Sequence, residues 1–492
     1  MLTLNDLFLI SPLANHPKMN RIRSVTLTLL AIACLAHSSV AQDVKSGHRL
    51  YARLCASCHG ANLQGGSGPS LVDAEWTNGS ERPQIVNAIA QGVPDKGMPA
   101  FGATLNSTQI NQIVDFIQAS GQPGDLAAAA PIDTLETLDY SVNMEIFADG
   151  LEIPWAIDFL DVRTALITER PGRLRVVRDG VLAPDPVADT PEVLHEGQGG
   201  LLDVTVDPNY AQNGWIYLSY SHALSQGGER VPAMTRVVRG RIRDNRWVDQ
   251  EVLFEAPHET YLPTRQHFGS RIVFDPAGNL YFSIGDRGQG EMAQDLSKPN
   301  GKIHRIRPDG SIPSDNPFAG RPDALPSIFS YGHRNPQGVA VHPTTGEVWN
   351  LEHGPRGGDE LNRVQAGRNY GWPVITYGIN YNGTIITEER RREGMEQPIF
   401  YWRPSLAVSG LAFYDADLFP YWKGKLLVSS LAANELRLLE LDGNRVMHEE
   451  VILKGAGRIR ESVVGPDGAI YVVLNEPDRV VRLSPRQDLS MR

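Results

Sequence analysis

Six copies of one pattern recur along the C-terminal two-thirds of the chain, and this repeat limits the fold more than any other feature. Each copy has a short apolar strand, a turn rich in Asp, Pro and Gly, and a second apolar strand. The copies begin at Trp155, Leu201, Arg271, Gly338, Gly410 and Ser462. Their spacing of roughly 50–70 residues, without a long helical pattern between them, predicts a mostly β domain. We expect a six-bladed β-propeller with four strands in each blade, and a β-sandwich with coincidental turns is the alternative.

The length of the chain requires more than this one domain. A chain of 492 residues exceeds the size at which a single hydrophobic core keeps growing. Residues 121–138 contain a Gly-, Pro- and Ala-rich stretch without core-forming periodicity, which predicts a linker. The predicted domains are therefore residues 43–120 and residues 139–485. The net charge of −11 argues against a nucleic-acid partner, because phosphates require a basic face.

A haem-attachment motif stands near the start of the first domain. Cys55 and Cys58 enclose two residues and His59 follows at once, which is the C-x-x-C-H pattern. Two thiols at this spacing can add to the porphyrin vinyl groups while the adjacent imidazole binds the iron. The alternatives are a redox dithiol and half of a zinc site. A zinc site needs four ligands, and the sequence has no second Cys pair. The motif therefore predicts one covalently attached haem c.

Met98 is the candidate for the second axial ligand of the haem iron. It stands between Gly97 and Pro99, where a methionine is poorly placed to fill a core. Apolar residues at helical spacing flank this region on both sides, and Ser107 or Thr108 is expected to cap the second helix. These helical residues are Leu50, Tyr51, Leu54, Ile110, Ile113, Val114 and Ile117. Residues 43–120 resemble a small all-α class I cytochrome c, a family that hydrogen-bonds the haem histidine where this chain has Gly68-Pro69.

The first 41 residues have the order of a secretory signal. A basic start, an apolar run and a small-residue cleavage site ending at Ala41 follow one another, and Met19 fits the true start of such a signal. A lipobox ending at Cys34 is a weak alternative, because Ala31 stands where leucine is usual. No other stretch is long and apolar enough for a transmembrane helix. We therefore expect export to the periplasm, with Cys55 and Cys58 as the remaining cysteines.

Several motifs of the second domain occur together in one order. They are Gly197-Gln-Gly-Gly-Leu-Leu-Asp203, Gly332-His-Arg-Asn-Pro-Gln-Gly338, Glu352-His-Gly-Pro-Arg-Gly-Gly-Asp-Glu-Leu-Asn362, Asn369-Tyr-Gly-Trp-Pro373 and Arg458-Ile-Arg460. Over residues 140–485 the chain resembles the soluble quinoprotein aldose dehydrogenases, which include glucose and sorbosone dehydrogenases. The resemblance implies pyrroloquinoline quinone (PQQ) as cofactor and an aldose as substrate. No Gly-x-Gly-x-x-Gly motif opens a βαβ unit, which argues against a nicotinamide or a Rossmann-bound flavin.

Arginines are the candidate PQQ ligands, because the cofactor carries three carboxylates and guanidinium groups bind carboxylates in pairs of hydrogen bonds. Arg334, Arg458 and Arg460 are these candidates, and the last two alternate on an expected strand, so that their side chains share one face. Under the resemblance, Gln198 and Asn335 contact the cofactor as well, and Ser405 occupies a position where the family has a threonine.

The resemblance also assigns the base and the metals. His267 aligns with the catalytic histidine of the family, and an imidazole titrates near neutrality, as a base that takes a proton from a sugar hydroxyl requires. A Ca²⁺ at the quinone oxygens would be held by the backbone carbonyls of Gly354 and Pro355. A second Ca²⁺ is implied at Glu360 and Tyr370 with Asp359, and a hydrogen-bond network that stabilises the loop is the alternative for these three.

The chain departs from soluble glucose dehydrogenase at positions that affect substrate preference. Gln266 stands where that enzyme has an aspartate beside the base, and residues 429–434 lack its PQQ-binding lysine. These departures fit the broader aldose sugar dehydrogenase branch of the family.

The leading hypothesis is an enzyme that oxidises an aldose to its lactone and passes electrons from PQQ through the haem to an external acceptor. This acceptor would be a soluble cytochrome or a terminal oxidase. A non-catalytic propeller that binds a glycan or a protein partner, fused to an electron carrier, is the alternative. A Ca²⁺-dependent lactonase is a third reading, which leaves the haem unused. The sequence leaves open a monomer and a homodimer.

Overall fold

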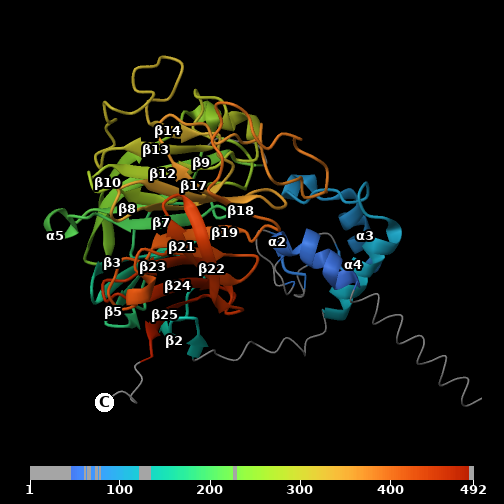
Figure 1. Cartoon of the computed structure of the whole chain (residues 1–492), viewed down its shortest axis with the longest axis horizontal. Helices are drawn as coiled ribbons and strands as arrows, with labels where there is room; N and C mark the ends of the chain where they lie inside the picture. The colour runs from blue at the N-terminus through green and yellow to red at the C-terminus, as the bar shows by residue number, and fades with distance from the viewer. Residues whose placement is uncertain are drawn as a thin grey trace, which may run out of the picture.

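The computed structural model describes residues 46–59, 63, 68–71, 76, 79–120, 134–224 and 230–486. The predicted signal peptide, residues 1–41 with Cys34, and most of the predicted linker lie outside these residues. A large β domain and a smaller helical body lie side by side, and the helix α2 is on the side of the helical body that faces the β domain (Figure 1).

Six antiparallel sheets form the large domain, which confirms the predicted six-bladed β-propeller. The first blade consists of β3 (Pro154–Asp161), β4 (Thr164–Glu169), β5 (Arg173–Arg178) and β6 (Val181–Leu182). The next two consist of β7 (Leu201–Val206), β8 (Ile216–Ala223), β9 (Ala233–Arg243) and β10 (Arg246–Phe254), and of β11 (Ile272–Phe274), β12 (Leu280–Ile284), β13 (Lys302–Ile306) and β14 (Ile328–Tyr331). Two more consist of β15 (Pro336–Val341), β16 (Val348–Glu352), β17 (Asp359–Val364) and β18 (Phe400–Trp402), and of β19 (Val408–Phe413), β20 (Leu426–Ser430), β21 (Glu435–Asp442) and β22 (Arg445–Lys454).

The sixth blade joins the two ends of the propeller sequence. Its strands are β1 (Thr134–Glu136), β2 (Ser141–Ala148), β23 (Arg458–Val464), β24 (Ile470–Asn475) and β25 (Arg479–Pro485). They pair in the order β1-β2-β25-β24-β23, so this blade has five strands instead of the expected four. The pairing of Val142 on β2 with Pro485 on β25 closes the ring of blades. Closure of this kind leaves no blade at an open end of the repeat.

The six repeats found in the sequence lie on the innermost strands. Each repeat begins on, or one residue before, β3, β7, β11, β15, β19 or β23. Each inner strand contacts the inner strands of both neighbouring blades, so the six form a complete ring. Apolar side chains fill the space between blades. Between the last two blades, for example, Leu427 and Leu436 pack with Ile470 and Val472.

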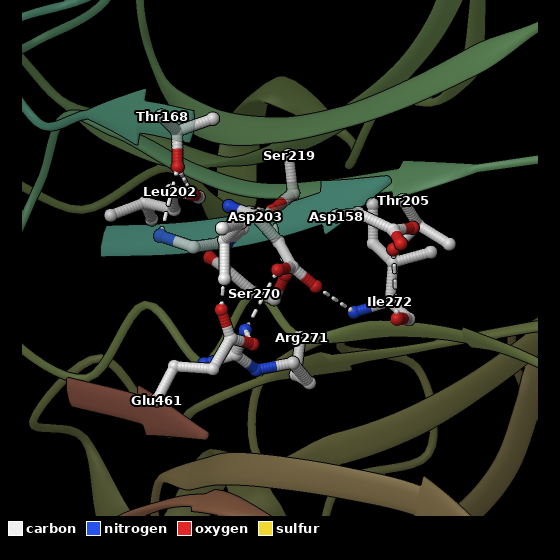
Figure 2. Close-up of polar contacts among 12 residues, drawn as sticks. Asp158, Thr168, Leu202, Asp203, Thr205, Ser219, Ser270, Arg271, Ile272 and Glu461 are labelled. Atoms are coloured by element: carbon white, nitrogen blue, oxygen red, sulfur yellow. Dashed lines mark hydrogen bonds and ion pairs between the residues drawn. The ribbon is translucent and has the colours of Figure 1, made fainter. Parts of the chain in front are cut away.

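Buried polar groups connect the inner strands near the centre of the ring (Figure 2). Arg271 donates from Nη1 to Oδ1 of Asp203 at 2.8 Å and also to Glu461. The backbone N–H of Ile272 donates to the other oxygen of Asp203 at 2.6 Å. Burial raises the pKa of Asp203 to about 6 and that of Glu461 to about 8. This cluster links three blades and fixes the strands whose ends surround the functional site.

The described residues between 46 and 120 form helices. They are a helical stretch at residues 46–54, α2 (Ala56–His59), α3 (Arg82–Gln91), the 3₁₀ turn η1 (Pro94–Lys96) and α4 (Ser107–Ser120). Tyr51 and Leu54 are buried, as are Ile113 and Val114 on α4, in agreement with the predicted apolar faces. The cap of α4 differs from the prediction. Asn106, not Ser107 or Thr108, accepts the backbone N–H of Gln109 at 2.9 Å, because it precedes the first helical residue.

Short helical turns connect some of the propeller strands. They are α5 (Tyr210–Asn213), η2 (His258–Thr260), η3 (Gly290–Ala293) and η4 (Pro420–Trp422). Within the described part of the chain, no helix has the length and apolar character that a membrane span requires.

Candidate active site

One cavity of about 830 Å³ lies between the helical body and the propeller and is lined by both. From the helical body it includes Cys55, Cys58, His59 and Met98. From the propeller it includes Gln198, His267, Arg334, Asn335, Ser405, Arg458 and Arg460. Residues that the sequence assigned to two cofactors therefore surround one continuous space.

The haem motif lies on the helical side of this cavity. Nδ1 of His59 lies 2.8 Å from the carbonyl oxygen of Pro69, the contact that the resemblance to cytochromes c predicted. If His59 donates from Nδ1, its Nε2 is left for a metal. A side chain at Gly68 would place its Cβ 2.9 Å from the imidazole, so only glycine fits. Cys55 and Cys58 form no disulfide, and Met98 lines the same cavity. This arrangement fits a haem between His59 and Met98.

His267 and Asp286 form the central pair on the propeller side. Nδ1 of His267 lies 2.6 Å from Oδ1 of Asp286, so the carboxylate orients the imidazole and leaves Nε2 for the reaction. Burial lowers the pKa of His267, and the positive charge of Arg334 lowers it further, while Asp286 opposes both. This lowered pKa favours the unprotonated imidazole that a general base requires.

The backbone around His267 has an uncommon conformation. Its φ of +56° lies in the left-handed region, where non-glycine residues are rare and which is found in proteins at functional positions. Its backbone N–H donates to Oε1 of Gln198 at 2.8 Å. Gln198 was predicted to contact the cofactor. In the structure it lines the cavity and also supports the backbone of the base.

Asp286 was missed by the sequence analysis. It lies in the loop after β12, and a lone aspartate in a Gly-Asp-Arg-Gly turn gives no signal of a partner 19 residues away. Trp372 donates its indole N–H to Oδ2 of Asp286 at 2.7 Å. Burial alone would raise the pKa of this carboxyl, but the charge and hydrogen bond of His267, with Arg334, hold it below its usual value. Asp286 is therefore ionised, and its two carboxylate oxygens are bound by His267 and Trp372.

A cluster of guanidinium groups faces the same cavity. Arg170, which the sequence analysis did not select, joins Arg334, Arg458 and Arg460 among its lining residues. Burial lowers the pKa of Arg170 to about 10, with Arg458 adding to the shift. Burial also lowers the pKa of Arg460, and its neighbours Arg458 and Arg170 lower it further. Buried positive charges that repel one another in this way favour the binding of a multiply charged anion.

Several polar atoms of the site have no hydrogen-bond partner among the described residues. They are Nε of Arg334, Nη1 of Arg458, Nε of Arg460, Nδ2 of Asn335 and Nε2 of His353. Buried donors rarely stay unpaired, because each costs free energy. A flat anion with carboxylates and carbonyl oxygens would accept hydrogen bonds from these donors. The residues present therefore fit PQQ.

The Gly354-Pro355 turn is fixed by charged neighbours. Arg334 donates from Nη1 to the carbonyl oxygen of Gly354 at 2.8 Å. The backbone N–H of Gly354 donates to Oδ1 of Asp359 at 2.9 Å, and Ser405 donates from Oγ to both carboxylate oxygens at 2.7 and 2.8 Å. Burial raises the pKa of Asp359 to about 6. Asp359 and Ser405 thus hold the loop whose carbonyls were predicted to bind a Ca²⁺.

Asp359 and Glu360 are neighbours on β17, and the charge of Asp359 contributes to the raised pKa of Glu360. Because they are consecutive on β17, their side chains point to opposite faces, and the carboxylate oxygens of Asp359 are already accepting hydrogen bonds. Glu360 pairs across the strands with Glu352, and burial together with Glu352 raises its pKa well above the usual value. Tyr370 stacks on His333 at 4.7 Å between ring centres. No cluster of three or more His, Cys, Asp or Glu side chains suited to a metal occurs among the described residues.

Tyr381 lines the cavity and was not selected from the sequence. Burial raises its pKa, and both Arg334 and Cys58 are close enough to affect it. Arg356, another propeller residue, is likewise near enough to Cys55 for the two groups to affect each other's pKa. The edge of the helical body that carries the two cysteines therefore faces the propeller.

Comparison with known proteins identifies the larger domain. Residues 151–482 match the family model described as Glucose / Sorbosone dehydrogenase. The chain belongs to the glucose and sorbosone dehydrogenase family. Residues 42–117 match a second model, described as Cytochrome C oxidase, cbb3-type, subunit III, which indicates a cytochrome c domain. Both resemblances drawn from the sequence are confirmed.

Similar proteins have the same enzyme class in their names. The aldose sugar dehydrogenase YliI of Escherichia coli (strain K12) is 43% identical over 353 residues, which are 70% of this chain and 94% of the relative. The crystal structure of the soluble aldose sugar dehydrogenase of Escherichia coli in the apo-form covers 70% of this chain and 100% of its own, with a TM-score of 0.66 and 43% identity. The PQQ-bound aldose sugar dehydrogenase of Streptomyces coelicolor covers 70% and 98%, with a TM-score of 0.57 and 25% identity. This family member is therefore a sugar-oxidising dehydrogenase, not a non-catalytic propeller.

Proposed function

We propose that this protein oxidises an aldose at C1 to the lactone with PQQ as the acceptor, and passes the electrons through its own haem to an external acceptor. The single observation that carries this proposal is the shared cavity, which brings His267, the arginine cluster and the Cys55–His59 motif around one space. A hydrolytic propeller would need neither the arginine cluster nor the haem motif.

The residues of the propeller divide the work of the proposed reaction. Nε2 of His267 removes the proton from the C1 hydroxyl, while Asp286 holds the imidazole and stabilises the charge that it gains. When bound, PQQ supplies an ortho-quinone that accepts the hydride from C1. Arg458 and Arg460 would bind and orient the carboxylates of this cofactor, and the unpaired Nδ2 of Asn335 would donate to one of its oxygens.

Calcium is part of the proposal, as the family resemblance implies. The carbonyls of Gly354 and Pro355 would hold the ion at the quinone, where it would act as a Lewis acid. The turn that carries them is fixed by Asp359 and Arg334, so these side chains position the carbonyls. For the second ion we propose Glu360 and Tyr370 with Asp359, which also has the structural role described above.

The proposed haem domain is an all-α cytochrome c of residues 43–120. Cys55 and Cys58 would form the thioether bonds, and His59 and Met98 the axial ligands. When attached, the haem supplies a one-electron carrier. Tyr381 is close enough to both Cys58 and Arg334 for their charges to affect its pKa, so residues proposed to hold the haem and residues proposed to hold PQQ approach the same side chain. This proximity supports direct electron transfer between the two domains.

The proposal also covers export, the linker and the electron acceptor. Residues 1–41 would direct export to the periplasm and be removed, and residues 121–138 would join the domains. A soluble cytochrome or terminal oxidase would accept the electrons, and the protein would act as a monomer or a homodimer.

Reconstitution of the haem-loaded protein with PQQ and Ca²⁺ tests this function. Anaerobic addition of an aldose is expected to reduce the haem, visible in its absorption bands, and a panel of sugars identifies the substrate. The matched variant His267→Gln should not respond to sugar, yet its haem should still be reduced by dithionite. Absence of haem reduction by every aldose of the panel would contradict the proposal.

A further inference from the structure

A short loop of the cytochrome domain lines the cavity that contains His267, the proposed general base. Residues 93–98, here called the Met98 loop, contain the turn η1 and are closed by two backbone hydrogen bonds between Val93 and Met98, at 2.9 and 3.1 Å. Gly97 ends the turn with a φ of +80°. The loop therefore has a fixed shape, and Lys96 and Gly97 are exposed at its tip.

The tip of the Met98 loop faces Gln266, the neighbour of the base. Lys96 and Gly97 line the same cavity as Gln266 and His267. A Cβ at Gly97 would lie 3.5 Å from Oε1 of Gln266, with no other heavy atom within 4 Å. The backbone of Gln266 is held by Arg287, which donates to its carbonyl oxygen at 3.1 Å. The two domains therefore come within van der Waals range at Gly97 and Gln266, and the cavity that both residues line opens beside this point.

The polar side chains of Lys96 and Gln266, where the two domains approach each other, are available to a ligand. In the described part of the chain, neither the Lys96 ammonium nor the Gln266 side-chain amide has a hydrogen-bond or ion-pair partner. One belongs to the cytochrome and the other to the propeller, and both line the cavity beside His267. Ammonium and amide groups are suited to the neighbouring hydroxyls of a sugar.

The size of the cavity limits what can bind there. Pockets for one small molecule have about 300–1,000 Å³. The cavity of about 830 Å³ lies within this range, although the proposed function requires it to accept parts of two flat cofactors as well as the sugar. Because this one volume would be shared by the substrate and the cofactors, it favours a single sugar ring over an oligosaccharide.

We propose that the cytochrome domain forms one wall of the sugar site, with Lys96 and Gln266, which line the cavity beside His267, binding the hydroxyls of a monosaccharide. This inference rests on the proposed function and extends it. The haem domain then selects the substrate as well as carrying electrons. Gly97 is the residue that sets the width of the site.

Two variants test the wall directly. Gly97→Asn adds a side chain toward Gln266, and asparagine tolerates the left-handed conformation. Lys96→Ala removes the donor without changing the turn. The matched controls are Gly394→Asn, at a left-handed glycine with open space around it (φ +79°), and Lys423→Ala, at an exposed ion pair. The Kd of a monosaccharide for the reduced, PQQ-loaded protein is measured by calorimetry, together with KM and the affinity for PQQ.

Each active-site variant should weaken the binding of monosaccharide by about tenfold or more, the effect of one added or missing group in a specificity pocket. The loss in Gly97→Asn should grow from a monosaccharide to a disaccharide. The affinity for PQQ, the haem spectrum and both controls should stay at the native values. A native protein that reduces its haem with sugar, with both variants binding sugar as tightly as the native protein, would overturn this inference alone. A native protein that binds and oxidises no aldose would overturn the proposed function as well.

Discussion

His267 is useful as a base only while Asp286 holds it in one tautomer. Asp286→Asn should therefore lower kcat for sugar-dependent haem reduction by about 10²–10⁴-fold, the usual contribution of an oriented acid–base group. The carboxylate also raises the pKa of His267. Its removal should lower that pKa, so the acidic limb of the kcat/KM profile should move to lower pH. A stopped-flow pH series measures both effects.

A control separates this role from a general loss of stability. Asp315→Asn removes an exposed carboxylate that pairs with the buried Arg305, and it should leave kcat unchanged. If Asp286→Asn kept the native kcat and the native pH profile, His267 would not depend on Asp286 as we infer.

A substitution at Arg458 tests how a single residue recognises the cofactor. Arg458→Lys keeps the positive charge but loses the pair of parallel N–H groups, so the Kd for PQQ should rise by about tenfold or more. The matched change Arg163→Lys, at an exposed ion pair with Asp179, should leave the Kd unchanged. Equilibrium dialysis in the presence of Ca²⁺ measures both values. Equal affinity in the two variants would contradict a paired contact from Arg458.

The inner strands depend on the central cluster of Arg271, Asp203 and Glu461. Arg271→Met leaves two buried carboxylates without their common partner, so the free energy of unfolding should fall by about 3–5 kcal/mol. The matched change Arg321→Met removes an exposed partner of Asp323 and should cost less than about 1 kcal/mol. Denaturant unfolding of the haem-loaded protein measures both. Equal stabilities in the two variants would contradict a structural role for the cluster.

The same cluster gives a dependence of stability on pH with a definite sign. The folded state raises the pKa of Glu461 to about 8, above the usual value of 4.5, so it binds more protons than the unfolded chain between these pH values. The contribution of Glu461 to stability therefore falls as the pH rises through this window. In thermal melts, the difference between the native protein and Glu461→Met should shift against the native protein as the pH rises. A shift in the opposite direction would contradict the raised pKa.

The elements were largely predictable because their signals are local. Each inner strand repeats the same apolar pattern, so six blades follow from the sequence, and period-3.6 spacing gave the helix that became α4. The exceptions are one contact between distant residues and one choice among adjacent capping residues. β1 and β2 join the closing blade through the pairing of Val142 with Pro485. Asn106 caps α4 because it is the residue that directly precedes the first helical turn.

At the scale of the whole molecule, the site depends on contacts that no local sequence pattern predicts. The candidate residues could be found by motif, but Asp286, Arg170 and Tyr381 could not, because each acts through a neighbour that is remote in the sequence. The docking of the cytochrome on the propeller likewise depends on shape, as where Gly97 approaches Gln266 and Gly383 approaches Thr104. This docking determines how electrons would pass between the two cofactors.

The most direct test of the account is the order of the haem-reduction reaction. The protein loaded with haem, PQQ and Ca²⁺ is mixed anaerobically with an aldose that it oxidises, and haem reduction is followed by stopped flow at several protein concentrations. The shared cavity predicts a first-order rate that does not change with protein concentration, because the electrons pass within one molecule. A rate that rises in proportion to protein concentration, or a haem that sugar does not reduce, would contradict the account.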